Sequence, residues 1–139
     1  MSVIYLIGSL RNSKIPEIGD VLRKSGHDVF DEWISAGPEA DDYFQKYHQE
    51  RGLNYKQALQ SYAAKHIFDF DYFHLLRADV AVMVLPAGRS AHLEFGFMIG
   101  QGKKGYILLD KEPERYDLMY NFATDIFFDI KDLNAALVN

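Results

Sequence analysis

Apolar residues fall into short runs along this chain, with longer mixed stretches between them. The run after Asp79 reads Val-Ala-Val-Met-Val-Leu and contains no polar residue. Alternation would indicate a strand with one solvated face, whereas a continuous run is typical of a strand buried on both faces of a parallel sheet. Pro86 and Gly88 end this run. We predict four further strands, at residues 3–7, 27–31, 105–109 and 126–128.

Helical stretches alternate with these strands. We expect helices at 14–24, 66–77, 90–101 and 130–137, with Asn12 or Ser13 capping the first and Asp129 capping the last. Strands that alternate with helices predict a parallel α/β sheet with right-handed crossovers. The expected fold is therefore a single α/β domain over residues 1–139. It is a doubly wound, five-stranded parallel sheet with the flavodoxin-like order 2-1-3-4-5.

The segment between the second and third predicted strands is longer than a crossover needs. It begins with a polar loop at 35–42, continues as helical pieces at 43–51 and 55–64, and is interrupted by Gly52-Leu53-Asn54. A further short helical segment is expected at 116–122. Long excursions of this kind often cover sites or form interfaces.

The carboxyl ends of strands one and three should meet at the switch point of this strand order. Gly8-Ser9-Leu10-Arg11 and Gly88-Arg89-Ser90 follow these strands, each at the start of a helix. Helix N-termini favour anions, so the two loops are a plausible seat for an anion or for sugar hydroxyls. Arg11 and Arg89 are candidate anion ligands because the guanidinium fork suits phosphate, although loop arginines are often simply solvated.

Glu94 is anomalous because Leu93, Phe95, Phe97 and Met98 surround it in a largely apolar helix. Two interpretations remain open. The carboxylate could lie in solvent near the helix N-terminus, where the helix dipole favours it. Alternatively, it could lie at the carboxyl edge of the sheet, where open α/β folds bind ligands.

Asp69 and Asp71 precede the third strand on a helix, and residues two apart point in different directions. We therefore expect at most one of them to face a site, and Asp71 is the better candidate because it lies one turn from Leu75. With Glu94 it would form a carboxylate pair. Such pairs suit glycosidic chemistry, in which one group attacks or stabilises the anomeric carbon and the other moves protons.

The composition of the chain limits the classes of binding partner that we expect. The chain has 20 acidic and 15 basic residues, a net charge of −5 and no cysteine. This charge argues against polymeric nucleic acid as a partner, and the lack of thiols fits a cytoplasmic location. No apolar run approaches membrane-spanning length, and the first residues do not resemble a signal peptide. Asp71-x-x-His74 has metal-ligand spacing without further ligands nearby, so we expect neither a metal nor another cofactor.

The motifs and their order resemble the nucleoside 2-deoxyribosyltransferase family, including its 2'-deoxynucleoside 5'-monophosphate N-hydrolase relatives. The resemblance rests on Tyr5-Leu-Ile-Gly8-Ser9-Leu-Arg11, on Asp71 eight residues before Asp79, and on Gly88-Arg-Ser-Ala-His-Leu-Glu94-Phe-Gly96. It implies a retaining double displacement without a cofactor. In this scheme Glu94 attacks C1' of the deoxyribose, Asp71 protonates the leaving base, and a second base or water then takes the sugar.

The resemblance also implies substrate contacts and an assembly. It places Tyr5, Gly8 and the 88–90 loop around the sugar, and it implies a homodimer or higher homo-oligomer with sites at the interface. Met119 to Asn121 would then reach a neighbouring subunit's site. Ser9, Arg11 and Ser90 look closer to the monophosphate hydrolases, whose matching positions hold a 5'-phosphate, so water could compete with a base as acceptor.

Two aromatic residues remain ambiguous. Trp33 follows strand two and could stack on the base, or it could belong to the core. His92 could bind substrate or merely occupy the first helical turn. Two other functional classes also remain open, namely a non-catalytic nucleotide-binding module on the same fold and an interaction protein that uses the aromatic segment 43–62.

Overall fold

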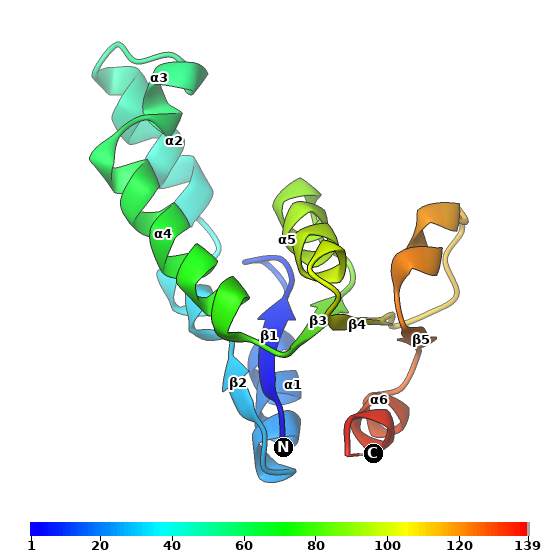
Figure 1. The fold of residues 1–139 in the computed structure, drawn as a ribbon. Coiled ribbons are helices and arrows are strands. Elements are labelled where there is room, and N and C mark those ends of the chain that lie inside the picture. The colour runs from blue at the N-terminus through cyan, green and yellow to red at the C-terminus, as the bar shows by residue number, and fades with distance from the viewer. Residues whose placement is uncertain (139) are drawn as a thin grey trace.

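A computed structural model of the chain describes residues 1–138. Its sheet has five parallel strands in the order β2-β1-β3-β4-β5, which confirms the predicted fold class and strand order (Figure 1). The strands are β1 (Val3–Ile7), β2 (Asp28–Phe30), β3 (Val80–Val84), β4 (Lys104–Leu108) and β5 (Asp125–Phe127). Every residue of β3 is buried, as its unbroken apolar run predicts.

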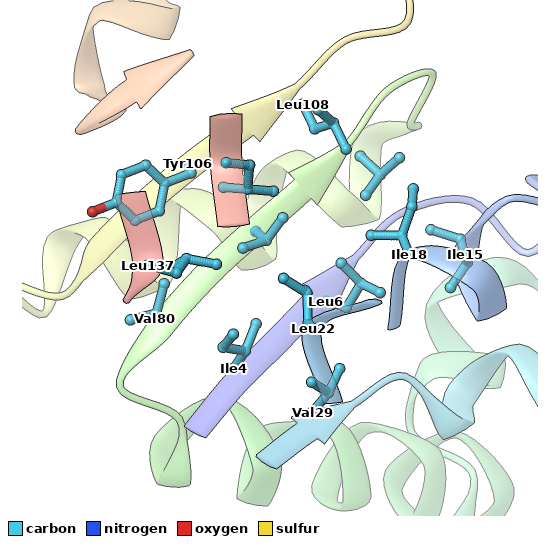
Figure 2. Close-up of a cluster of buried hydrophobic side chains, with 13 residues drawn as sticks. Ile4, Leu6, Ile15, Ile18, Leu22, Val29, Val80, Tyr106, Leu108 and Leu137 are labelled. Carbon is cyan, nitrogen blue, oxygen red and sulfur yellow. The ribbon is translucent and has the colours of Figure 1, made fainter. Parts of the chain in front are cut away.

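Helices cover both faces of the sheet. On one face, α1 (Ile15–Lys24) and α6 (Ile130–Leu137) pack on an apolar cluster that includes Ile4, Leu6 and Val82, whose buried side chains are drawn in Figure 2. On the other face, α4 (Tyr62–Arg77) and α5 (Arg89–Gly100) pack on the alternate strand positions. Asp129 accepts a hydrogen bond from the Lys131 amide, which confirms it as the cap of α6.

The excursion after β2 consists of a 3-10 helix, η1 (Glu32–Ala36), followed by α2 (Ala40–Glu50), α3 (Tyr55–Leu59) and α4. In Figure 1 this helical arm projects away from the sheet. The prediction of a polar loop over residues 35–42 is wrong, because η1 runs to Ala36 and α2 already begins at Ala40. Asp41 and Asp42 lie in the first turn of α2, where acidic side chains complement the helix dipole.

Two predicted helix boundaries are also corrected. The piece predicted at 55–64 ends at Leu59, and α4 starts at Tyr62, because Ser61 Oγ accepts a hydrogen bond from the Ala64 amide at 3.1 Å. Before α1, the N-cap is Lys14 and makes no side-chain cap bond. Asn12, two residues before that N-cap, instead accepts a hydrogen bond from the Lys14 amide at 3.0 Å. The segment predicted at 116–122 is a 3-10 helix, η2 (Leu118–Phe122).

Gly105 in β4 allows α5 to lie close to the sheet. A Cβ at this position would come within 2.5 Å of Ile99 Cδ1 and 2.9 Å of the Phe95 ring. We expect Gly105→Ala to destabilise the protein by about 1–3 kcal/mol through overpacking. Gly100→Ala is the matched control, since a Cβ there meets nothing within 4 Å. Chemical denaturation of both variants measures the difference, and equal stabilities would contradict the close packing.

Candidate active site

The carboxyl ends of β1 and β3 open into a cleft of about 760 Å³. Adjacent pairing of these strands brings their following loops together, as expected for a switch point. The cleft is walled by the β1–α1 loop, the start of α5, η1, and parts of α2 and α4. Ten of the thirteen residues predicted from the sequence line it, namely Tyr5, Gly8, Ser9, Arg11, Trp33, Asp71, Gly88, Arg89, Ser90 and Glu94.

Glu94 and Tyr5 both line the cleft and are hydrogen-bonded to each other. Tyr5 is 1% exposed, and its hydroxyl donates a hydrogen bond to Glu94 Oε2 at 2.8 Å. Burial raises the pKa of Glu94 to about 7, and the nearby Asp71 charge adds to this, while the Tyr5 hydrogen bond acts in the opposite direction. Burial and the same two carboxylates raise the pKa of Tyr5, so it remains a proton donor. Glu94 thus lies at the sheet edge and not in bulk solvent.

Asp71 enters the cleft from α4. Burial raises its pKa to about 6. Asp69, two residues earlier, is exposed and does not line the cleft. Two carboxylates from different helices, both with pKa values moved toward neutrality, therefore face one cavity. Such an arrangement can supply a nucleophile and a proton donor in the same pH range.

An aromatic wall lines part of the same cleft. It contains Trp33 from η1, Phe44 from α2 and Phe70 from α4. The Trp33 indole N–H donates to the Leu6 carbonyl at 2.7 Å, and the ring packs against both core clusters. Trp33 is therefore part of the core and of the cleft wall at once. Phe44 and Phe70 carry no sequence motif that marks them as site residues, although Phe70 adjoins Asp71 on its helix.

The other end of the cleft is polar. Ser9 Oγ accepts a hydrogen bond from the Arg11 amide at 3.1 Å, so it organises the β1–α1 loop. A smaller cavity of about 330 Å³ adjoins the cleft and shares Ser9, Arg11 and Gly88 with it. Hydroxyls, loop amides and a guanidinium at this end suit sugar oxygens or an anionic substituent.

Comparison with solved structures shows what this architecture is similar to. A 2-deoxyribosyltransferase from Bacillus psychrosaccharolyticus superposes with a TM-score of 0.67 at 21% identity, over 94% of this chain and 89% of that one. The chain has the 2-deoxyribosyltransferase fold. The CMP N-glycosidase of Clostridium botulinum superposes with a TM-score of 0.56 at 16% identity, over 98% of each chain. No protein-family model and no curated protein matches the sequence.

Three predicted site residues lie outside the cleft of this 2-deoxyribosyltransferase fold. His92 hydrogen-bonds through Nδ1 to the Gly88 carbonyl at 2.7 Å and through Nε2 to the Tyr120 hydroxyl at 2.9 Å. Because a carbonyl only accepts, Nδ1 carries the proton and Nε2 accepts from Tyr120. His92 therefore ties the Gly88 loop to η2 and does not face the cavity. Met119 and Asn121 are exposed on η2, away from their own chain's cleft.

His74, which has metal-ligand spacing from Asp71, stacks on Phe30 with ring centroids 3.8 Å apart and an interplanar angle of 7°. Within residues 1–138, no group of three or more His, Asp or Glu side chains is placed to hold a metal ion. Over the same residues, no helix of this 2-deoxyribosyltransferase fold is both long and apolar enough to cross a membrane.

Proposed function

We propose that this protein cleaves the N-glycosidic bond of 2'-deoxynucleosides and transfers the deoxyribosyl group to another base, with water as a competing acceptor. The observation that carries this proposal is the pair of carboxylates, Glu94 and Asp71, in one cleft with an aromatic wall. Burial raises both pKa values, to about 7 and about 6. The likeness to a deoxyribosyltransferase and to an N-glycosidase supports the same chemistry.

In the first step, an ionised Glu94 oxygen bonds to C1' as the C1'–N bond breaks, and the bonding electrons leave with the base. Asp71 gives its proton to the departing nitrogen. In the second step, a nitrogen of an acceptor base, or a water oxygen, attacks C1' and releases Glu94. Asp71 takes back the acceptor's proton, so both carboxyl groups return to their starting states.

The pKa values alone would favour the reverse roles, because Glu94 holds its proton more tightly than Asp71. We assign the nucleophile to Glu94 because Tyr5 donates to Oε2, which stabilises the carboxylate and leaves Oε1 for the substrate. Mass spectrometry of rapidly quenched protein, followed by peptide mapping, tests this assignment. A deoxyribosyl group on the Asp71 peptide would reverse the two roles.

Base release is the primary test of the proposed function. The protein is incubated with 2'-deoxynucleosides and their 5'-monophosphates, with and without a free acceptor base, and the products are separated by chromatography. A new nucleoside formed only with acceptor present supports a transferase. Free base from monophosphates alone supports a hydrolase, for which Ser9, Arg11 and Ser90 would hold the phosphate. No release from any substrate would indicate a nucleotide-binding module.

The paired titrations predict a bell-shaped pH profile for kcat/KM. The reactive form has Glu94 ionised and Asp71 protonated, with pKa values of about 7 and about 6, so its population rises with pH up to about 6 and falls above about 7. Because the donor ionises before the nucleophile, the reactive form is always a minority, and the maximum lies midway between the two values. The two limbs belong to the coupled pair. Initial rates in buffers of constant ionic strength measure the profile, and a plateau from pH 5 to 9 would contradict it.

Exposed apolar side chains support assembly into a homo-oligomer. Phe68, Phe73 and Leu76 on α4, Leu93 on α5 and Phe122 on η2 are each 46–75% exposed. Large apolar side chains exposed on several elements are a feature of protein–protein interfaces. Self-association would bring Met119 and Asn121 of one subunit toward a neighbour's cleft. We expect size-exclusion chromatography with light scattering to show a dimer or larger species, and a monomer at micromolar concentration would contradict this.

A further inference from the structure

An exposed ion pair joins two walls of the cleft. Arg11, in the loop after β1, places Nη2 3.0 Å from Oδ2 of Asp42 in the first turn of α2. Both side chains are 66% exposed. Arg11 lines the cleft, and Asp42 follows Ala40 and Asp41, which also line it. The guanidinium best placed to bind an anion at this end therefore already has a carboxylate partner.

The charges around the cleft also disfavour an added anion. Four acidic side chains line it, from Glu32, Asp41, Glu94 and Asp71, the last of which carries a proton in the reactive form, against the two guanidinium groups of Arg11 and Arg89. Lys14 lines only the adjoining smaller cavity. A phosphate dianion would have to take Arg11 from Asp42 and then remain close to the displaced carboxylate. Repulsion between the phosphate and the nearby Asp42 carboxylate would weaken binding, even at a solvated surface.

We propose that Asp42 is a specificity-determining residue, which occupies Arg11 and so makes the cleft select 2'-deoxynucleosides without a 5'-phosphate over their 5'-monophosphates. This inference rests on the proposed function, because it chooses between two substrates of the same cleft. An uncharged 5'-hydroxyl leaves the Arg11–Asp42 pair intact, whereas a phosphate must break it. Asp42 thus lowers the affinity for the 5'-monophosphate without contacting the reacting atoms.

Asp42→Asn tests the proposal, with Glu50→Gln as the matched control. Glu50 lies on the same helix and pairs with Lys46 at 4.0 Å, so its variant removes the same charge from α2 without releasing Arg11. The values measured are kcat/KM for 2'-deoxyadenosine and 2'-deoxycytidine and for their 5'-monophosphates. Calorimetric Kd values for the same compounds are measured with all variants carrying Glu94→Gln, so that ligand is not consumed.

We expect Asp42→Asn to strengthen monophosphate binding about five- to tenfold and to leave nucleoside binding within about twofold, as suits an exposed pair that competes with a charge-assisted contact. Glu50→Gln should change neither value. Adding Arg11→Met to Asp42→Asn should abolish the gain. An unchanged ratio of the two Kd values, or an unaltered chain that already prefers monophosphates, would overturn the role of Asp42. Absence of base release would instead overturn the proposed function, and the Kd ratio would still decide this inference.

Discussion

Glu94→Gln is expected to reduce the rate of base release by at least about 10⁴-fold, because a carboxamide oxygen lacks the charge needed to form the glycosyl ester. The substitution preserves the size of the side chain, and Tyr5 can still donate its 2.8 Å hydrogen bond to an amide oxygen. Single-turnover measurements at saturating substrate isolate the chemical step. Retention of more than about a tenth of the native rate would exclude Glu94 as the nucleophile.

Thermal stability provides an independent control for this variant. Burial raises the pKa of Glu94 to about 7 in the folded protein from its ordinary value of 4.5. A raised carboxyl pKa makes folding less favourable as pH rises from the unfolded value through the folded value, because the unfolded chain ionises first. At pH 8 the native protein carries this full cost and the Gln variant does not. We therefore expect an inactive variant whose Tm at pH 8 is equal to or above the native value.

Asp71→Asn is expected to lower kcat/KM by about 10²–10⁴-fold, the range typical of a lost general acid. The loss should be greatest for bases that are poor leaving groups, since these depend most on protonation. The descending limb of the pH profile should disappear as well. Kinetic measurements with a series of nucleosides that differ in base acidity test all three expectations.

Asp69→Asn is the matched control for Asp71→Asn. It removes an identical side chain from the same helix, but at an exposed position outside the cleft. Its kcat/KM should remain within about twofold of the native value, as for most surface substitutions. Equal losses in both variants would mean that Asp71 acts through the stability or charge of α4 and not by proton transfer.

The sheet could be predicted because its strands carry unambiguous patterns. The run after Asp79 has no polar position, and the structure buries every residue of β3. Helix limits within the excursion were harder to predict, because α2 and α4 expose much of their surfaces and lack a clear apolar stripe. Ser61 shows the difficulty. The sequence from Tyr55 onward has a continuous helical pattern. In the structure, one 3.1 Å hydrogen bond to Ser61 makes this residue the N-cap of α4 and divides the pattern into two helices.

The cleft was partly predictable for a similar reason. Gly8 and Gly88 follow from the topology, since strand ends one and three must adjoin at the switch point, whereas Tyr5 was expected only from the family resemblance. Phe44 and Phe70 could not be assigned, because their place in the cleft wall depends on how α2 and α4 are positioned beside the β1–α1 loop. His92 illustrates the reverse case, since its helix position is compatible with a substrate ligand, yet its ring is turned to Gly88 and Tyr120.

Trp33 gives the protein an intrinsic optical reporter. It is the only tryptophan in the chain, and it lines the cleft while packing against both core clusters. A base stacked on its indole should quench the emission, whereas unfolding should shift the emission maximum to the red as the ring enters water. The two events therefore give distinguishable spectra from one fluorophore. Fluorescence titration of the unlabelled protein can thus follow ligand occupancy and structural integrity in the same cuvette.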